Sequence, residues 1–393
     1  MKTIYSLLFL SAIAWGYSCT DKYSEELTMN VPVYMSYNDL RASVAGAPAR
    51  PLVRPGKIYF KGIHLFIVEY LQGIHIVDVS NPSQPQHTGF IEVPGCVDIA
   101  VRDQSLYADS YVDLVAIDIS DPTRPKVTER LNDVFPYTLP APEEEAYPCA
   151  EVTKEKGVVV AWEVKRETRE IKSRDPSIPV YYIYDKNNYA LAESSDAAWN
   201  GSSVSFGKSG SMARFGLYDN YLYIADNSQL YIFNTDTPPV PTFIWKQYLQ
   251  GSAETMFIYD GHMFFGTPSG MMVYNLNQPL QPEYTGTFWH VTSCDPVVVQ
   301  DGYAYITLRS GTSCDPNAVN RLDVVEVSED YKKYTLVNSY PMTNPHGLGI
   351  DGETLFVCDG ADGLKIYDAT DKQRVTNHLL AAFPNIQAYD VIP

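Results

Sequence analysis

The chain has 393 residues and a formal net charge of −18, with 47 acidic residues against 29 basic ones. This negative field repels nucleic acid and anionic lipid, which disfavours any function that binds a phosphate backbone. Only 19% of the residues are charged, whereas 30 are Tyr. That composition is typical of a β-rich protein with many half-buried aromatic positions.

Residues 1–18 are predicted to be a secretory signal peptide. A short basic start precedes an apolar run, Ile4–Trp15, that is too short to anchor stably in a bilayer. Gly16-Tyr17-Ser18-Cys19 then resembles a bacterial lipobox, with Gly16 where that pattern usually has Leu, and the resemblance implies acylation of Cys19. Residues 20–26 form either a polar tether similar to that of surface-exposed Bacteroidetes lipoproteins or a linker that carries no targeting signal. We expect an outer-membrane lipoprotein on the cell-surface or periplasmic face.

A strand that stops at an acidic or amide residue before a Pro-rich turn recurs down the chain. A second apolar strand lies upstream of each copy, and pairs such as Asp260-Gly261 predict tight hairpins. Four strands per unit of roughly forty residues, without helices, indicate an all-β fold, a β-propeller. We expect seven four-stranded blades, with eight as the alternative. The seven copies are Ile74–Asp78, Leu114–Asp118, Val180–Asp185, Leu230–Asn234, Met271–Asn275, Leu322–Glu326 and Leu364–Asp368.

The predicted domain plan has the signal peptide, an N-terminal segment over residues 19–50 that carries the tether, and one propeller over residues 51–393. Long departures from the repeat predict insertions at 132–148, 165–179, 187–211 and 310–320. We expect Ile386–Ile392 to pair beside the first blade and Val31–Met35 to add an outer strand to the last one. Such mixing of the chain ends would remove free sheet edges.

Leu114-Val-Ala-Ile-Asp-Ile-Ser-Asp-Pro122 and Gly73-Ile-His-Ile-Val-Asp-Val-Ser-Asn-Pro82 resemble the LVIVD repeat. Asn30–Ser36 and Leu106–Tyr111 are likewise similar to segments of LVIVD-repeat lipoproteins of Bacteroidetes. The resemblance implies a propeller in the cell envelope. It assigns no activity to named residues.

The acidic or amide residue that ends each strand is interpreted as a turn cap rather than as part of a ring of cation sites. In an exported protein disulfides persist, and Cys294 with Cys314 is the first pair expected, clamping a hairpin. Cys96 and Cys149 form the second, and Cys358 is predicted to be a buried free thiol. The sequence has no Cys-x-x-Cys pair and no His at the spacing of metal ligands, so we expect no metal site. No cofactor is expected either.

The insertions all fall on one face of the predicted propeller, where the inner strands begin. The first residues of those strands converge on the mouth of the channel, where they could bind a small polar ligand or a cation, perform acid–base work, or only solvate the channel. They are Asp98, Glu151, Arg214, Thr255, Asp295 and His346. Three aromatic residues, Tyr137, Trp162 and Trp199, could stack on a sugar or a partner, or anchor the loops by packing.

No nucleophile or phosphate-loop motif has the setting that its chemistry needs. The sequence therefore favours a non-enzymatic binding scaffold or accessory subunit of an outer-membrane protein complex, attached to the membrane through its lipid only. A glycan-binding surface lipoprotein is the first alternative. A propeller hydrolase that uses His346 and Glu151 at the channel mouth is the second.

Overall fold

The computed structural model describes residues 23–171, 214–236, 240–290, 296–310 and 319–393. Five of the predicted functional positions lie outside these described residues. They are Cys19, Trp199, Cys294, Asp295 and Cys314. Among the described residues, no helix has the length and apolar character needed to cross a membrane.

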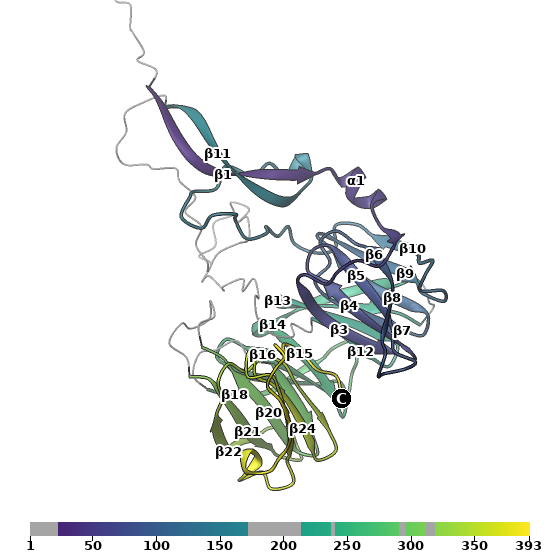
Figure 1. Ribbon diagram of the computed structural model, residues 1–393, viewed down its shortest axis with the longest axis vertical. Helices are drawn as coiled ribbons and strands as arrows, with labels where there is room; N and C mark the ends of the chain where they lie inside the picture. The colour runs from purple at the N-terminus through teal and green to yellow at the C-terminus, as the bar shows by residue number, and fades with distance from the viewer. Residues whose placement is uncertain (1–22, 172–213, 237–239, 291–295, 311–318) are drawn as a thin grey trace, which may run out of the picture.

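In the described part of the chain, the body of the molecule is a β-propeller of six blades (Figure 1). Blade 1 comprises β3 (Pro55–Lys61), β4 (His64–Glu69), β5 (Gly73–Asp78) and β6 (Gln86–Glu92), with β2 (Ala45–Ala47) outside β6. Blade 2 comprises β7 (Ile99–Arg102), β8 (Ser105–Ser110), β9 (Asp113–Asp118) and β10 (Lys126–Leu131). Blade 3 comprises β12 (Phe215–Tyr218), β13 (Tyr221–Asn234) and β14 (Thr242–Ala253).

The remaining three blades follow in chain order. Blade 4 comprises β15 (Thr255–Tyr259), β16 (His262–Thr267), β17 (Gly270–Asn275) and β18 (Glu283–Trp289). Blade 5 comprises β19 (Val297–Gln300), β20 (Tyr303–Leu308), β21 (Arg321–Val327) and β22 (Tyr334–Pro341). Blade 6 comprises β23 (Leu348–Asp351), β24 (Thr354–Cys358), β25 (Leu364–Asp368) and β26 (Leu379–Phe383).

Blade 3 matches the others because β13 contains both of its middle strands. The N–H of Thr235 donates to the carbonyl of Asn220 at 2.7 Å, so the two ends of this 14-residue element meet. A straight strand of that length would hold its ends about 45 Å apart. Asn227, near the middle, has a φ of 52°, as the tip of a tight turn requires.

The described residues form six blades rather than the seven predicted, and the third predicted unit supplies no blade strand among them. Its supposed second strand, Val158–Trp162, belongs to β11 (Val158–Ile171), which pairs with β1 (Tyr23–Met35) and with no blade strand. The supposed repeat strand Val180–Asp185 lies outside the described residues. The described residues 132–171, here called the long excursion, thus follow β10 of blade 2 and belong to no blade.

The two strands β1 and β11 form a twisted ribbon, here called the arm, that extends away from the propeller (Figure 1). Their antiparallel register runs from Tyr23 opposite Ile171 to Met35 opposite Val158. A short helix, α1 (Tyr37–Ala42), connects the arm to the blades. Strand β1 therefore includes residues 23–26, which the sequence assigned to a polar tether.

Buried Asn30 ties a loop of the long excursion to the arm. Its amide Nδ2 donates to the carbonyls of Glu144 and Tyr147 at 2.8 and 2.9 Å, and its backbone bonds to both Pro148 and Ala150. The buried side chain of Asn30 thus satisfies two backbone carbonyl groups in the turn of the predicted insertion 132–148. A short 3₁₀ turn, η1 (Lys154–Lys156), then leads into β11.

Hydrophobic clusters fill each junction between consecutive blades, from blades 1 and 2 through to blades 5 and 6. Among the described residues, no such cluster joins blade 6 to blade 1. A second short 3₁₀ turn, η2 (Val375–Asn377), precedes the last strand of blade 6. In each blade the consecutive strands pair in sequence order, and in blade 1 the earlier strand β2 is added outside β6.

The predicted mixing of the chain ends is also wrong. Val31–Met35 lies in the arm, and the C-terminal segment after β26 forms no named strand. That segment lies against blade 6, where the N–H of Gly347 donates to the carbonyl of Tyr389 at 2.9 Å. Its last residues line a central cavity together with Lys57 of blade 1.

The turn-capping interpretation of the repeated acidic or amide residue is confirmed in five blades. In each, the side-chain oxygen accepts the N–H two residues later, at 2.6 to 3.3 Å, and the bond lowers the pKa of Asp78 and Asp118. The residues are Asp78, Asp118, Asn234, Asn275 and Asp368. These residues end strands and leave the opposite face of the propeller regular.

Candidate functional site

A buried acidic residue stands at the end of the second strand in four blades. Glu69 accepts the N–H groups of Val53 and Arg54, and Asp109 accepts those of Val97 and Asp98. The positions are Glu69, Asp109, Asp226 and Asp359, each no more than 8% exposed. The sequence reasoning missed them, although an acid after each Leu-led second strand was a visible signal.

Two predicted channel-mouth residues, Asp98 and Arg214, do come together between blades 2 and 3. Asp98 is completely buried and accepts N–H bonds from Ile99, Arg214 and Phe215. The guanidinium of Arg214 bonds to Asp109. Burial raises the pKa of Asp98 to about 6, although the charge of Lys57 and the backbone donors oppose the shift.

Asp226 adds a third carboxylate to this cluster. It is 8% exposed and lies 3.6 Å from the guanidinium of Arg214. Burial raises the pKa of both Asp226 and Asp109, and the charge of Arg214 counteracts part of that rise. Burial alone would lower the pKa of Arg214, but the two carboxylates outweigh it and raise that pKa.

A pocket opens above this cluster, on the face where the insertions emerge. Its polar floor consists of Asp109, Arg214 and Asp226. Turns of blades 1, 2 and 3 and the start of the long excursion form its walls, and its volume is about 90 Å³. The wall residues include Tyr70, Leu71, Tyr111, Phe135, Leu139 and Asn227.

The charges of the floor restrict what the pocket can hold. A cation bonded to Asp226 would sit roughly 5 Å from the Arg214 guanidinium, a repulsion of about 3 kcal/mol at an effective dielectric constant of about 20. That repulsion offsets roughly half of the attraction to Asp226, about 5.5 kcal/mol at about 3 Å on the same basis. An anion would instead be repelled by the carboxylates of Asp109 and Asp226. A neutral group that both donates and accepts hydrogen bonds suits the floor best.

His346 lies elsewhere, in blade 6, and is 3% exposed. Its ring contacts the guanidinium of Arg309 at 3.0 Å and the ring of Tyr389 edge-on at 4.9 Å. Burial, helped by the charge of Arg309, lowers its pKa to about 4. It is therefore a neutral, buried imidazole rather than a group at the mouth of a shared site.

The other described channel-mouth residues are also dispersed. Thr255 is buried at the start of β15 and lines the central cavity, about 180 Å³, together with Lys57 and the C-terminal residues. Glu151 is exposed beside the arm, in the segment that Asn30 holds. The structure thus unites Asp98 with Arg214 but not with Glu151 or His346.

The two described aromatic candidates anchor loops by packing. Trp162 is 3% exposed, and its indole N–H donates to the carbonyl of Pro140 at 2.8 Å. Tyr137 packs beside it, with its hydroxyl donating to the carbonyl of Gly157 at 2.8 Å. Both therefore fix the excursion to the arm instead of offering a free ring to a ligand.

The predicted bridge between Cys96 and Cys149 is wrong. Cys96 is buried in the core between blades 1 and 2, whereas Cys149 packs with Trp162 at the arm. We expected the two cysteines on the inner strands of adjacent blades, but Cys149 belongs to no blade. Cys358 is confirmed as a buried free thiol, and burial raises its pKa to about 12.

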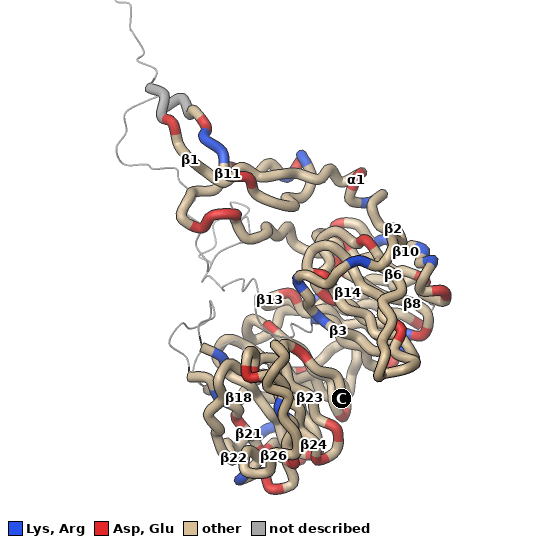
Figure 2. The backbone as a smooth tube through the Cα atoms, in the orientation of Figure 1, with Lys and Arg blue, Asp and Glu red and all other residues tan. Residues whose placement is uncertain are grey.

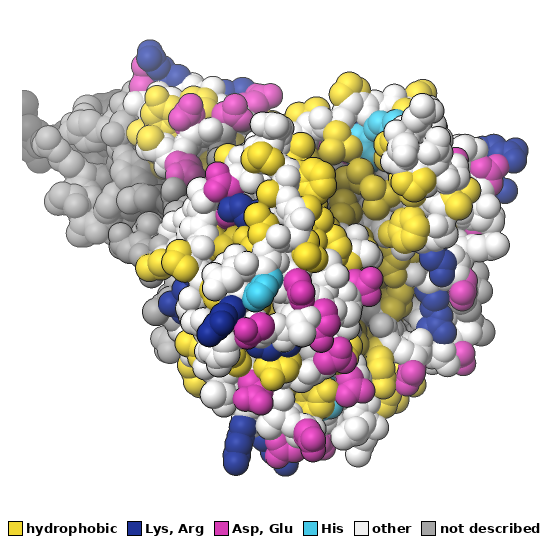
Figure 3. Space-filling view, turned by 60° about the horizontal axis from the view of Figure 1, so that its bottom comes forward, with side chains coloured by type: hydrophobic (Ala, Val, Ile, Leu, Met, Phe, Trp, Pro, Cys, Tyr) yellow, Lys and Arg dark blue, Asp and Glu magenta, His cyan; other side chains and the backbone are white. Residues whose placement is uncertain are grey.

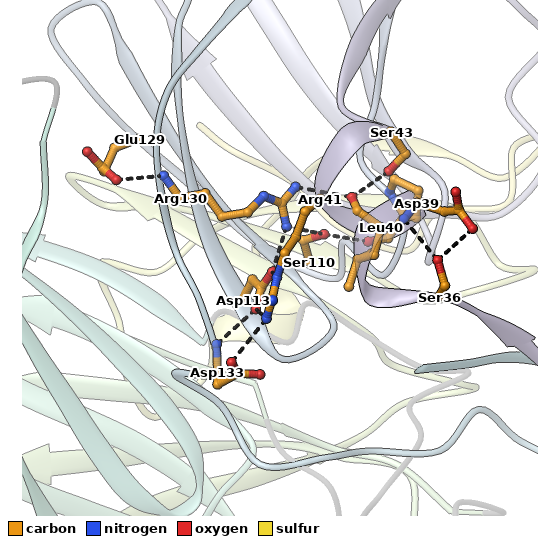
Figure 4. A network of polar contacts seen from close by, with 11 residues as sticks. Ser36, Asp39, Leu40, Arg41, Ser43, Ser110, Asp113, Glu129, Arg130 and Asp133 are labelled. Atoms are coloured by element: carbon orange, nitrogen blue, oxygen red, sulfur yellow. Dashed lines mark hydrogen bonds and ion pairs between the residues drawn. The ribbon is translucent and has the colours of Figure 1, made fainter. Parts of the chain in front are cut away.

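A buried ion cluster fixes the base of the arm to blade 2 (Figure 4). Asp113 is completely buried and accepts bonds from the guanidinium groups of Arg41 in α1 and Arg130 in β10, at 3.1 and 3.0 Å. It also accepts the N–H of Asp133 at 2.9 Å. Leu40, beside Arg41, is buried among apolar residues of blade 2 and the arm.

The distribution of charge differs between the arm and the body. Figure 2 shows basic and acidic residues together on the arm, and acidic residues spread over the blades. Figure 3 shows exposed apolar side chains in the upper part of the body, with acidic side chains below them. Within the described ranges, no group of three or more His, Cys, Asp or Glu residues is arranged to hold a metal ion.

The family model of the LVIVD repeat matches residues 57–91, 97–133 and 209–233. The chain is an LVIVD-repeat β-propeller. The first two matches cover blades 1 and 2, and the third ends within β13 of blade 3. The two blades that frame the pocket floor are therefore repeat units themselves. A search of curated proteins found no match to this LVIVD propeller.

Solved structures share the fold of this LVIVD propeller at low sequence identity. A candidate 6-phosphogluconolactonase of Bacteroides uniformis aligns with a TM-score of 0.56 and 8% identity, over 94% of this chain and 97% of that one. Another, from Bacteroides fragilis, has a TM-score of 0.54 and 11% identity over 95% and 97%. A Lactobacillus plantarum protein aligns with a TM-score of 0.54 and 11% identity, over 87% of each chain. These likenesses concern the fold alone.

Proposed function

We propose that this LVIVD propeller is a lipid-anchored, non-catalytic binding protein of the outer membrane that acts as a scaffold or accessory subunit of an envelope protein complex. The observation that supports the proposal is the arm. Strand β1 begins at Tyr23, four residues after the predicted lipid site Cys19. The chain therefore passes from its lipid almost directly into a paired strand.

The arm sets the distance between the membrane and the propeller. Its 13-residue strand β1 spans about 40 Å at roughly 3.3 Å per residue. A flexible tether of the same length would let that distance vary. Because Asp113 binds two arginines at the base, the arm also has a fixed direction relative to blade 2. The insertion-bearing face is then presented at a set height to a neighbouring protein.

The arm itself has an edge suited to a protein partner. Strand β11 pairs with β1 on one side and, within the described part of the chain, with no strand on the other. Its exposed charges pair locally, as in the bridge from Lys165 to Glu163 at 2.5 Å and from Arg166 to Glu26 at 3.8 Å. Such charges protect an edge from aggregation while leaving it able to accept a specific partner strand.

Affinity purification of the tagged protein from its own cells tests the scaffold role. We expect a stoichiometric envelope protein partner, and we expect Val164→Asp on β11, where the side chain is 38% exposed, to weaken its recovery. Val127→Asp is the matched control, because Val127 is 44% exposed on β10 of blade 2. A protein recovered alone from cells, or equal losses in both variants, would overturn the proposal.

The same preparation separates the alternatives. Retention of the lone protein on polysaccharide would favour a glycan-binding lipoprotein. A hydrolase built on His346 and Glu151 has little geometric support, because one is buried in blade 6 and the other is exposed beside the arm. Should a substrate screen find turnover, unchanged rates in His346→Ala and Glu151→Ala would exclude that site.

A separate measurement tests the lipid anchor. Cys19→Ser should abolish incorporation of labelled fatty acid and move the protein from the membrane fraction to the soluble fraction. Membrane retention of the variant would show that the anchor is not a lipid on Cys19.

A further inference from the structure

We infer that the pocket between blades 1, 2 and 3 binds a neutral polyhydroxylated ligand of about the size of one sugar ring. The pocket is separate from the arm edge, so this inference stands whether or not the arm has a protein partner. Three features of the pocket support it, namely the polar atoms of the floor, the aromatic walls and the volume between them.

The floor holds an acceptor that no described residue satisfies. In blades 1, 2 and 6 the matching acids, Glu69, Asp109 and Asp359, each accept two backbone N–H groups. Asp226 accepts no hydrogen bond from any residue that the structure describes, and its contact with Arg214 is an ion pair at 3.6 Å. A buried carboxylate of this kind needs donors.

A buried donor lies beside it. The Nε–H of Arg214 has no hydrogen-bond partner, although the same guanidinium reaches Asp109. Both the acceptor and the donor belong to residues that line the pocket. A hydroxyl group supplies both a proton for Asp226 and a lone pair for Arg214, and it brings no charge into a floor that already holds charges of both signs. Ligands with several adjacent hydroxyls fit this requirement best.

The walls supply apolar contact. Tyr70, Tyr111 and Phe135 line the pocket from blade 1, blade 2 and the long excursion. Aromatic rings pack well against the C–H face of a sugar ring, because that face of the sugar is apolar whereas the edge of the sugar is polar. The cavity of about 90 Å³ has room for roughly six water molecules. Together these waters occupy a volume comparable to that of one pyranose.

The backbone of the rim is held in an uncommon conformation. Leu71, Tyr111 and Asn227, at the tips of the turns of blades 1, 2 and 3, have φ angles of 61°, 55° and 52°. Non-glycine residues with positive φ cost free energy and gather at ligand sites. Three such residues converge on this one pocket.

Titration calorimetry on the full chain tests the site. The probes are methyl glycosides of glucose, galactose and mannose, a short oligosaccharide of the hexose that binds, and, as charged controls, methylammonium and acetate. We expect one glycoside to bind with a Kd on the order of 1 mM, and neither charged control to bind at that level. Tighter binding of the oligosaccharide would identify a glycan chain as the source, and equal binding would identify a free sugar.

Variants assign the binding to this pocket. Asp226→Asn keeps the shape of the side chain and should weaken the glycoside at least about tenfold. Phe135→Leu should weaken it as well by removing the aromatic wall. Trp289→Ala, at a 71% exposed ring on blade 4, is the control and should change nothing. Thermal melts would verify folding. If no glycoside binds, if methylammonium or acetate binds as well, or if only Trp289→Ala weakens binding, the inference is wrong.

Discussion

The blades and the arm are both made of antiparallel strands, but they find their partners at different distances along the chain. Apart from β2 in blade 1, each blade pairs strands that are neighbours in sequence, such as β8 with β9. The arm pairs β1 with β11, more than a hundred residues later. The strand Val158–Trp162 looks like a blade strand and yet joins the arm. Local pattern therefore identifies a strand, whereas available partners decide which sheet it enters.

The two regions also differ in what holds them. Apolar clusters between neighbouring blades stabilise the propeller. The arm is a two-stranded ribbon, which is marginal by itself in water, so polar anchors such as Asp113 and Asn30 support it. Substitutions in one region should leave the other intact, and the following predictions test that separation.

The largest effect is expected at the junction of the two regions. Asp113→Ala leaves the guanidinium of Arg130, whose side chain is 10% exposed, without its carboxylate and should cost about 3–5 kcal/mol of unfolding free energy. Asp133→Ala is the control, because that carboxylate is 68% exposed and its pair with Arg41 is worth less than about 1 kcal/mol. Urea unfolding compares the two. Equal losses would show that the buried cluster is not the anchor.

The next effect depends on pH and belongs to the propeller. The folded state lowers the pKa of His346 from 6.5 to about 4, so its contribution to stability is present above pH 6.5 and is lost as the pH falls towards 4. The loss should reach about 3 kcal/mol at pH 4, at about 1.4 kcal/mol per pKa unit. Thermal melts of His346→Gln should show a flatter profile over this range, while the exposed control His378→Gln keeps the original slope. An unchanged slope in His346→Gln would refute the assignment.

A matched pair of glycine substitutions compares the two regions directly. Gly73 in blade 1 has a φ of 148°, and a Cβ there would lie 2.0 Å from the carbonyl of Ile91. Gly157 at the arm has a φ of 120°, with a Cβ 2.0 Å from the carbonyl of Met35. Gly73→Ala should cost about 1–3 kcal/mol of global stability. Gly157→Ala should instead raise hydrogen exchange in β1 and β11 only. Exchange rising in the blades as well would show that the regions unfold together.

The smallest effect is expected within the arm. Asn30→Ala removes the side-chain bonds to Glu144 and Tyr147 and should cost about 1–2 kcal/mol locally. Limited proteolysis should then cut the loop near Glu144 sooner, with no change in the urea midpoint of the blades. Protection equal to that of the parent protein would mean that Asn30 does not hold this loop.

Much of the propeller was predictable because its signals are local. Six of the seven predicted repeat strands coincide with strands of the structure, and Asp-Gly or Asp-Asn pairs mark the turns. The LVIVD resemblance was confirmed for the same reason. The blade count was not predictable, since the apolar run Val158–Trp162 has the composition of a blade strand. Only its pairing with β1 shows that it is not one.

The strands, their turns and the regular face follow from local sequence, because alternating apolar residues and turn caps act over a few residues. The sequence also placed Asp98 and Arg214 at the starts of inner strands. Tertiary structure decided that these two meet over Asp109 and Asp226, that His346 is buried elsewhere, and that the chain's first strand joins an arm. Those outcomes depend on contacts between segments that lie far apart in the sequence.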